Sequence, residues 1–283
     1  MNKILNTPLC ITEEGASALR SLAASGIRLP DCAEKDGDLK KSIGRTYLGN
    51  KMPEPYTVDA TAVIPIEGPM VRGMGVLGDY LGMADMDEIK NWIQSAANDP
   101  EVKRIALSIR SPGGMAIGAP ELFAAVKQAT EKKPVMAYTD EMMASAAYFA
   151  GVAADAIYVT PSAIVGSVGT YLTLVDDSKL QENMGVKFIV LRSGKYKGAG
   201  IDGWTEEQLA EKQSIVDAID EQFKGAVSSS RIHISEKDLQ GQVFIGIHSV
   251  NTGFADFLTQ DLKTAIEHFT TLTQSTYEPS ATT

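Results

Sequence analysis

The sequence predicts an α/β fold assembled from βαβ units, with a short helical extension at the N-terminus. Short runs of apolar residues, typical of buried strands, alternate along most of the chain with segments whose apolar residues recur at helical spacing. A strand, a crossover helix and a second strand in succession are typical of a mostly parallel sheet. The composition agrees, because a chain of 283 residues with 44% hydrophobic and 22% charged residues can bury a sizeable core.

The first 59 residues are expected to lie outside that core. Residues 12–26 are predicted to form a short helix, with Thr12 at its N-cap and Gly26 at its end. From 27 to 59, glycine, proline, lysine and aspartate are scattered without a sustained period, which indicates an arm or linker. We therefore expect an N-terminal helix and arm over 1–59, a core domain over 60–271 and a flexible tail over 272–283.

Five apolar runs in the core domain are predicted strands. Pro65 lies inside the first of them, and because proline cannot donate to a sheet ladder, this part of the strand is expected at an edge or a bulge. The predicted strands are Ala62–Ile66, Ile105–Ile109, Val135–Tyr138, Ala156–Val159 and Phe188–Leu191.

Helical spacing appears between these strands and again after the last one. A long helix is predicted from Thr205 to Arg231, where Thr205 and Gln208 can form a capping box. Its apolar stripe should pack on the sheet or on another subunit. The apolar positions are Met86, Ile89, Trp92, Ile93 and Ala96 in one helix, Leu122, Ala125, Val126 and Ala129 in the next, and Leu209, Val216, Ile219, Phe223 and Val227 in the long helix.

The composition also argues against several classes of protein. A net charge of −10 argues against nucleic acid as the main partner, because phosphate binding needs clustered Lys and Arg. Two cysteines without CxxC spacing, Cys10 and Cys32, and three histidines predict no metal site, and no cofactor is expected. The first residues do not form a signal peptide, and no window approaches the ~18 apolar residues of a membrane span. We expect a cytoplasmic protein whose cysteines remain thiols.

A glycine-rich turn follows the predicted strand Ile105–Ile109. Its sequence is Ser111-Pro112-Gly113-Gly114. Paired glycines at the carboxyl end of a strand allow a sharp turn and leave N–H groups directed outward, which suits an anion or a developing oxyanion. The same residues also suit an ordinary turn from strand to helix. Neither of the phosphate-binding patterns GxxxxGK[ST] and GxGxxG occurs in the chain.

A second candidate is Ser145, within the segment from Met142 to Tyr148. It follows a predicted strand and opens a helix of small residues that runs to about Ala153. At a helix N-terminus the N–H of the next residue, Ala146, is free to donate, and negative charge is favoured. The alternative is that Ser145 only caps the helix.

Taken together and in order, these segments resemble the signal peptide peptidase A family and its phage relatives, the head-maturation proteases. The resemblance covers about 200 residues. It runs through the Ser111–Gly114 turn, the MMASAAY segment at Ser145, DAIYVTPSAIVGSVG from Asp155, GVKFIVLRSGKYKG from Gly185 and, more weakly, GFAD ending at Asp256. It implies the crotonase-like fold shared with the Clp protease and a Ser–Lys dyad.

By this resemblance, Ser145 is the nucleophile and Lys197 is the general base. Ser167 corresponds to the second serine, which orients the lysine amine. The oxyanion donors are the N–H groups of Gly114 (first choice) or Gly113, and of Ala146. The chain departs from many members in having Ala146 and Ala147 where they have glycines, and it lacks the N-terminal membrane span of the anchored members.

A lysine is almost wholly protonated at neutral pH, so it serves as a base only where an apolar environment lowers its pKa. The glycines and alanine around Lys197 are compatible with such an environment, and Lys195 is the rival base. The three histidines, His233, His248 and His268, all lie beyond the motifs, which argues against a Ser–His arrangement.

The residues around Ser145 are small or apolar and carry no charge. Met143, Ala144 and Ala147 are therefore expected to line a substrate pocket that accepts extended segments with small or apolar residues.

These inferences predict a homo-oligomeric serine endopeptidase with protein or peptide substrates. The phage branch is favoured, with capsid or scaffold proteins as substrates in the host cytoplasm and the procapsid. Three alternatives stay open: a soluble signal-peptide-peptidase-like bacterial peptidase, a crotonase-type acyl-CoA enzyme, and a non-catalytic assembly protein.

Overall fold

The computed structural model describes residues 9–11, 53–74, 78 and 81–277. The predicted helix over 12–26, the arm as far as residue 52, and Cys32 lie outside the described residues. The main sheet has six strands in the order β13-β10-β8-β6-β3-β2, all parallel except β2, which is antiparallel to β3. These strands are β2 (Tyr56–Val58), β3 (Thr61–Glu67), β6 (Arg104–Arg110), β8 (Val135–Thr139), β10 (Ala156–Val159) and β13 (Phe257–Leu258).

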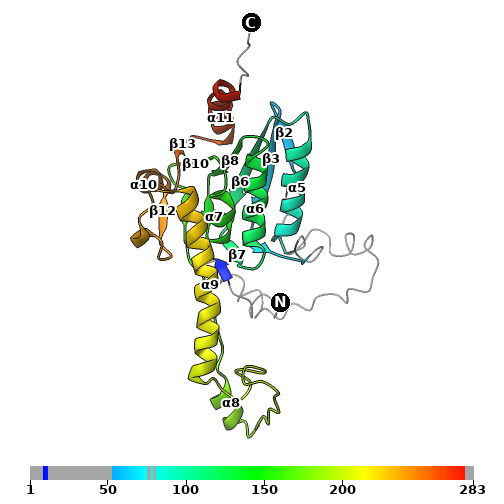
Figure 1. The fold of residues 1–283 in the computed structure, drawn as a ribbon, viewed down its shortest axis with the longest axis vertical. Helices are drawn as coiled ribbons and strands as arrows, with labels where there is room; N and C mark the ends of the chain where they lie inside the picture. Colours follow the sequence, from blue (N-terminus) through cyan, green and yellow to red (C-terminus); the bar gives the residue numbers. More distant parts are fainter. Residues whose placement is uncertain (1–8, 12–52, 75–77, 79–80, 278–283) are drawn as a thin grey trace, which may run out of the picture.

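Both faces of the main sheet are covered by helices. Successive residues of a strand point to opposite faces, and on β6 Ile105 and Leu107 belong to one buried cluster while Ala106 belongs to the other. The first face carries α5 (Met86–Asn98), α6 (Ala119–Thr130) and α7 (Ala146–Gly151), and the second carries α11 (Leu262–Tyr277) (Figure 1). The chain runs β3-α5-β6-α6-β8-α7-β10, so the predicted α/β class with βαβ units is confirmed.

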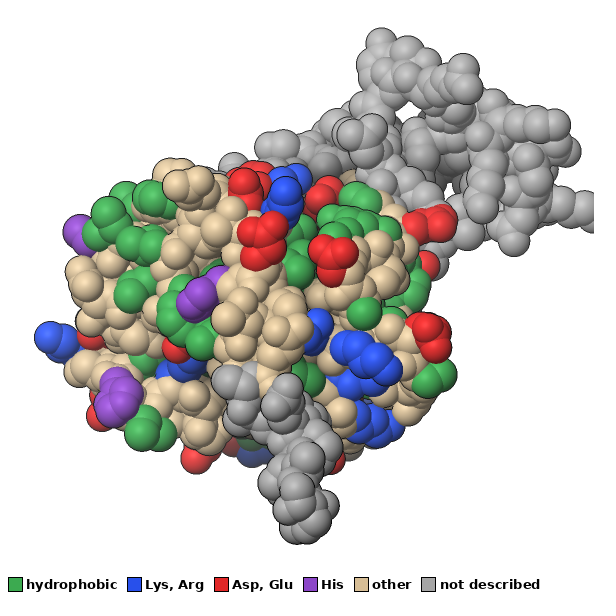
Figure 2. All heavy atoms as spheres, turned by 90° about the horizontal axis from the view of Figure 1, so that it is seen from above, with side chains coloured by type: hydrophobic (Ala, Val, Ile, Leu, Met, Phe, Trp, Pro, Cys, Tyr) green, Lys and Arg blue, Asp and Glu red, His purple; other side chains and the backbone are tan. Residues whose placement is uncertain are grey.

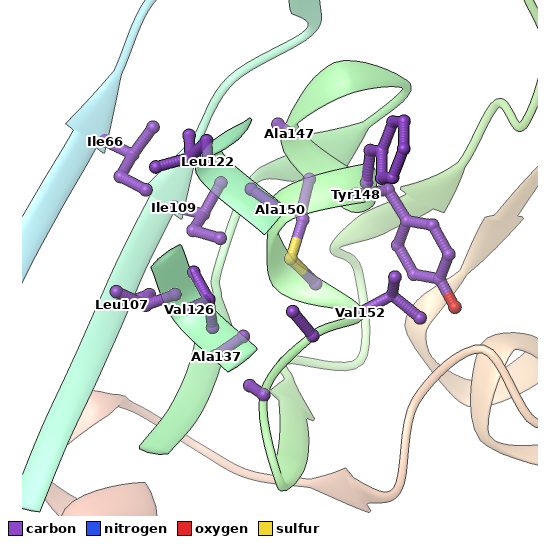
Figure 3. Close-up of a cluster of buried hydrophobic side chains, with 14 of the residues drawn as sticks. Ile66, Leu107, Ile109, Leu122, Val126, Ala137, Ala147, Tyr148, Ala150 and Val152 are labelled. Atoms are coloured by element: carbon purple, nitrogen blue, oxygen red, sulfur yellow. The ribbon is translucent and has the colours of Figure 1, made fainter. Parts of the chain in front are cut away.

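The larger buried cluster lies between the sheet and these three helices. Figure 3 shows strand residues such as Leu107 and Ile109 directed toward Leu122 and Val126 of α6, with Tyr148 of α7 at the other side of the cluster. Burial of each large apolar side chain contributes about 1.5–3 kcal/mol, so this layer holds the elements around the site in place.

Two smaller sheets extend the carboxyl ends of the main strands. One has the order β1-β7-β4-β5 and the other the order β12-β11-β9. Their strands are β1 (Leu9–Ile11), β4 (Met70–Val71), β5 (Ala84–Asp85), β7 (Gly113–Met115), β9 (Met142–Ala144), β11 (Ile164–Gly166) and β12 (Val243–Ile245). The remaining helices are α8 (Ser178–Asn183), α9 (Glu206–Ser230), the 3-10 turn η1 (Glu236–Asp238) and α10 (Gly246–Thr252).

Four of the five predicted strands are confirmed, as β3, β6, β8 and β10. Pro65 is on β3, beyond Val63, the last β3 residue that pairs with β2. It therefore sits where β3 has no ladder partner on that side among the described residues, which is the predicted edge position.

The predicted strand Phe188–Leu191 is wrong. These residues have no regular secondary structure, and Ile189 and Leu191 are 81% and 93% exposed. They belong to residues 171–205, a segment that contains α8. This segment and the N-terminal half of α9 project from the body of the molecule (Figure 1). From here on, 'the arm' means residues 171–205 and not the N-terminal segment discussed above. The apolar run meets no sheet of its own chain, and an apolar run alone does not reveal what will cover it.

The long helix α9 begins as predicted. The Gln208 N–H donates to Thr205 Oγ1 at 3.2 Å and the Thr205 N–H donates to Gln208 Oε1 at 3.3 Å, so the capping box is present. The apolar stripe is divided: Phe223 and Val227 are buried against the body, whereas Leu209 is exposed beside the arm. At the C-terminus, α11 continues to Tyr277, past the expected boundary at 271.

Candidate active site

The ends of β9 and β11 bring two of the predicted site residues together. These strands are parallel neighbours with Ala144 opposite Gly166. The next residue along each chain is Ser145 after β9 and Ser167 after β11, so the two serines are neighbours across the ladder. The Ser145 N–H donates to the Gly166 carbonyl oxygen at 2.8 Å. Both serines thus follow the carboxyl ends of parallel strands, where α/β proteins bind their ligands.

The glycine-rich turn lies on the other side of β9. The Ser111 carbonyl oxygen accepts from the Ala144 N–H at 3.2 Å. Gly113 has φ 93°, and its N–H donates to Ser111 Oγ at 3.2 Å. A side chain at Gly114 would place its Cβ 1.9 Å from the Met70 carbonyl oxygen of β4. Glycine is therefore required at Gly114 for β7 to pack on β4.

Ser145 itself is held in an unusual conformation. Its φ and ψ are 54° and −121°, a region that costs a non-glycine residue about 1–3 kcal/mol. The side chain is 1% exposed, and Oγ has no hydrogen-bond partner among the described residues. It occupies the N-cap position of α7 without making a capping bond, so the alternative that Ser145 only caps the helix is wrong. Ala146 is the first residue of α7, so its N–H has no acceptor within the helix.

Ser167 also has a positive φ. Its φ is 53°, its side chain is half-buried, and its N–H donates to the Gln242 carbonyl oxygen at 2.6 Å. The preceding Gly166 has φ 112°, and a Cβ there would lie 2.8 Å from the same carbonyl oxygen. The chain after β11 is therefore fixed by its neighbour at residues 241–242, next to Ser145.

The structure does not bring Lys197 to these serines within one chain. The Lys195 carbonyl oxygen accepts from Gln208 Nε2 at 3.2 Å, which holds residues 195–197 at the N-terminal end of α9. The body contacts α9 much further along, where the rings of Phe149 and Phe223 stack at 4.6 Å. With a rise of 1.5 Å per residue, Gln208 and Phe223 are roughly 22 Å apart along the helix. Lys197 is exposed, so the apolar environment expected around it is not present in the single chain.

The rival, Lys195, is exposed and paired. Its ammonium group contacts the Glu207 carboxylate, and this hydrogen bond raises the pKa of Lys195 above its ordinary value. A lysine that is held in its protonated form is a poor proton acceptor.

The predicted substrate pocket is not where the sequence places it. The side chains of Met143, Ala144 and Ala147 are fully buried, and Met143 Sδ packs against Gly151 inside the core. They cannot contact a substrate in this chain as it stands. The reason is that small and apolar residues beside a nucleophile suit the core that supports it as well as they suit a substrate pocket. The apolar side chain of Ile117, shortly after β7, is instead 51% exposed, and sequence reasoning did not single it out.

With this geometry in view, the chain can be compared with known proteins. The profile of peptidase family S49 matches residues 127–275, which include Ser145, Ser167 and Lys197. The chain belongs to peptidase family S49. This agrees with the resemblance inferred from the motifs.

Three relatives show the breadth of the family around this S49 chain. It is 30% identical over 218 residues to capsid assembly protease C of Escherichia phage lambda, a match that covers 74% of this chain and 49% of the relative. It is 28% identical to head-tail preconnector protein GP5 of Enterobacteria phage P21, covering 71% and 41%, and 27% identical to the chloroplastic serine protease SPPA of Arabidopsis thaliana, covering 79% and 34%. The chain thus spans half or less of the length of these relatives.

Among solved structures, the S49 chain is similar to a ClpP1 mutant from Listeria monocytogenes. The TM-score is 0.47 and the identity 10%, and the match covers 71% of this chain and 92% of that one. An enoyl-CoA hydratase/isomerase family member is also similar, with a TM-score of 0.44 and 13% identity over 83% of this chain and 79% of that one.

The histidines of this S49 chain lie apart from Ser145. His233, His248 and His268 are all exposed, and His268 Nδ1 lies 2.9 Å from the Tyr158 hydroxyl on the opposite face of the sheet from α7. Within the described ranges, no group of three His, Cys, Asp or Glu residues could hold a metal ion. None of the helices described is long and apolar enough to cross a membrane.

A basic hollow lies at the amino ends of the strands, opposite the candidate active site. Its volume is about 650 Å³, and Figure 2 shows basic side chains gathered on this end of the molecule. The lysines have a structural role: Lys132 Nζ donates to Asn98 Oδ1 at 2.8 Å and Lys133 Nζ donates to the Ala96 carbonyl oxygen at 2.7 Å, at the C-terminal end of α5. Cations there satisfy the last carbonyl groups of a helix. The basic residues are Lys103, Arg104, Lys132 and Lys133.

Proposed function

We propose that this S49 chain is a serine endopeptidase in which Ser145 is the nucleophile and Lys197 of a second copy is the general base. One observation carries the proposal. Ser145 is held at positive φ with a buried, unpartnered hydroxyl, at the carboxyl ends of parallel strands and between Ser167 and the glycine-rich turn. A strained serine in such a place is typical of a nucleophile, because the strain fixes the direction of the hydroxyl.

The chemistry follows from these positions. Ser145 Oγ attacks the peptide carbonyl carbon, and its proton passes to the lysine amine. The N–H groups of Gly114 and Ala146 stabilise the oxyanion. Gly113 is the less suitable donor because its N–H already bonds Ser111 Oγ. The ammonium then protonates the leaving amine, and water, activated by the same lysine, hydrolyses the acyl-enzyme. Ser167 Oγ accepts from the amine and orients it.

The position of Lys197 is the reason for proposing a second copy. Residues 195–197 are held at the N-terminal end of α9, far from the Ser145 of their own chain. The arm also exposes large apolar side chains that no described part of the chain covers, and apolar surface of this kind marks protein contacts. Packing of the arm on a neighbouring copy would bury these residues and desolvate the lysine. The exposed apolar residues of the arm include Val175, Leu180, Met184, Phe188, Ile189 and Leu191.

The biological role that we propose is maturation of a phage head, with capsid or scaffold proteins as substrates in the host cytoplasm and procapsid. Two relatives favour it, one named a capsid assembly protease and one a head-tail preconnector protein, both from phages. The alternative is a cellular peptidase, favoured by the chloroplast relative named a serine protease. Family S49 membership argues against an acyl-CoA enzyme. A non-catalytic assembly protein would not need the strained backbone conformation of Ser145.

Labelling with a fluorophosphonate probe tests the activity directly. The probe should modify Ser145 alone, as located by peptide mass spectrometry, and Ser145→Ala should abolish both labelling and cleavage of an unfolded protein substrate. Ser162→Ala, which removes an exposed serine outside the proposed catalytic unit, is the control that should be labelled as the wild type is. Absence of labelling in the assembled wild-type protein would overturn the proposal.

A further inference from the structure

A strand from the N-terminus lies against the glycine-rich turn. β1 pairs antiparallel with β7, with Leu9 opposite Met115, Cys10 opposite Gly114 and Ile11 opposite Gly113. Figure 1 shows this strand, in dark blue, at the edge of the body between β7 and α9. Gly113 and Gly114 are the glycines of the candidate oxyanion turn, so β1 follows the same backbone that faces Ser145.

The direction of β1 brings its carboxyl end toward the glycine-rich turn. Its chain runs from Met115 toward Gly113, that is, toward the turn that leads into the site. A peptide in this register would present the carbonyl group of its last paired residue near the oxyanion donors. Extended peptides commonly bind by adding a strand to the exposed edge of a sheet, where main-chain hydrogen bonds supply the affinity.

A strand has only two edges, and both edges of β7 are in use. β4 pairs with one edge of β7, with Met70 opposite Gly114, and β1 takes the other. β4 cannot leave without breaking the core, because Met70 is fully buried within the larger cluster. β1 is three residues long, and its sheet pairing is with β7 alone. A substrate that adds a strand to β7 must therefore displace β1.

We propose that Leu9–Ile11 is a pseudosubstrate strand that occupies the peptide-binding edge of β7 and lowers the activity of the peptidase by competing with substrate until it leaves. The inference rests on the proposed function, because it identifies β7 as the strand that binds substrate. The strand supplies apolar residues, Leu-Cys-Ile, in an extended conformation. Because the strand is tethered to its own site, it acts at an effective concentration set by its linker, and a free peptide of the same sequence must compete with it.

The test compares three proteins in the assembled state. One lacks residues 2–12, a control lacks residues 2–7 and keeps β1, and the third is full-length Cys10→Pro, because a proline within the strand weakens its pairing. Removal of residues 2–12 should raise kcat/KM for an unstructured fluorogenic peptide about 10-fold, which corresponds to a strand whose effective concentration is about ten times its dissociation constant for β7. Cys10→Pro should raise kcat/KM as well, and the protein that lacks only residues 2–7 should have the kcat/KM of the wild type.

A peptide in trans completes the experiment. The nonapeptide Asn6–Glu14 should inhibit the protein lacking residues 2–12 competitively, and the same peptide with proline at the central cysteine should not. If kcat/KM is equal in all proteins and the nonapeptide does not inhibit, the proposal of a pseudosubstrate strand is wrong, whereas the proposal of peptidase activity is unaffected. If no protein cleaves substrate or labels at Ser145, the peptidase is wrong. Binding of the labelled nonapeptide to Ser145→Ala lacking residues 2–12, measured by fluorescence anisotropy, then still decides whether β7 binds this strand. If the deletion impairs folding, Cys10→Pro and its kcat/KM give the answer.

Discussion

Ser145 and Ser167 have nearly the same positive φ, 54° and 53°, and occupy neighbouring positions at the ends of two parallel strands. Each of these backbone conformations destabilises the fold by about 1–3 kcal/mol. Selection for stability would remove such a conformation unless the geometry were useful. Their hydrogen bonds run to adjacent segments of the same chain: the Ser145 N–H donates to the Gly166 carbonyl oxygen and the Ser167 N–H donates to the Gln242 carbonyl oxygen. The pair is therefore held as one rigid unit, and this is what a nucleophile and a positioning group require.

The hydroxyl of Ser167 and its backbone can be tested separately. Ser167→Ala removes the hydroxyl and keeps the strain, whereas Ser167→Gly removes both. If the hydroxyl positions the amine, kcat should fall ~10–100-fold in both variants, as for other supporting groups. Thermal unfolding should show Ser167→Gly to be at least as stable as Ser167→Ala, because glycine tolerates positive φ. Ser162→Ala, at an exposed serine just before β11, is the control that should leave kcat unchanged. Full activity in Ser167→Gly would exclude a role for the hydroxyl.

A second prediction concerns pH and the ion pair between Arg110 and Asp140 at the ends of β6 and β8. Arg110 Nε and Nη2 each donate to Asp140 at 2.7 Å, and these bonds hold the pKa of Asp140 below its ordinary value of 3.8. A carboxyl group with a lowered folded-state pKa adds stability above that ordinary value, and the contribution is lost as the pH falls through the folded-state pKa.

Asp140→Asn should therefore lower the free energy of unfolding at pH 7 by up to about 1 kcal/mol, a modest value because both side chains are partly exposed. The difference from wild type should shrink as the pH falls below the ordinary carboxyl pKa of Asp140 and vanish below its lowered folded-state pKa. Urea unfolding at several pH values measures it, with Glu182→Gln, at an exposed carboxylate of α8, as the control. A difference that persists unchanged in acid would show that the loss comes from packing.

The sequence predicts the body of the fold well because its strands are buried on both faces. β3, β6, β8 and β10 appear as apolar runs, and α5 and α6 between them have clear helical spacing. The positions of Ser145 and the glycine-rich turn could also be predicted, since each follows a predicted strand and the ends of parallel strands share one edge of a sheet. Ser167 is assigned by the family resemblance alone, because the strand before it, β11, is not among the predicted strands.

Three features could not be read from local pattern. Phe188–Leu191 has the composition of a strand, but no described residue of its own chain covers Ile189 or Leu191, which are largely exposed. Met143 and Ala147, beside the nucleophile, are apolar because they are buried in the core. In a sequence, the apolar side chains of a core cannot be distinguished from those of a pocket. The separation of Lys197 from Ser145 depends on α9 being a straight projecting helix, which spacing along the chain does not reveal.

The arm gives a third prediction, with a matched pair of variants. Ile189 and Ile232 are almost equally exposed, at 81% and 79%, but Ile189 is on the arm and Ile232 follows the opposite end of α9. Ile189→Asp should leave the fold unchanged by circular dichroism while it dissociates the oligomer and abolishes activity, because a carboxylate is costly to bury in an apolar contact. Ile232→Asp should change neither. Sedimentation velocity at micromolar concentration measures the outcome. If both variants sediment as the wild type does, the arm is not the contact.

The last prediction tests whether the serine and the lysine come from different copies. Ser145→Ala and Lys197→Ala should each abolish hydrolysis, and the double variant should be scarcely worse, because members of one catalytic unit are not additive. Lys197→Arg should be equally inactive, since a guanidinium does not release its proton in this range. Lys195→Ala should keep near-full activity, because Lys195 is paired with Glu207 at the surface.

Mixing the two inactive single variants is the decisive measurement. If each site takes its serine from one copy and its lysine from the next, random assembly of equal amounts should restore about a quarter of the sites, because a contact between unlike surfaces passes from copy to copy around a closed ring. The mixture must first be dissociated and reassembled, and Ser145→Ala mixed with the double variant is the control that should stay inactive. Recovery of activity only in the first mixture would establish a dyad shared between copies. No recovery, despite mixed oligomers seen by native mass spectrometry, would mean that Lys197 acts within its own chain after a large movement of the arm.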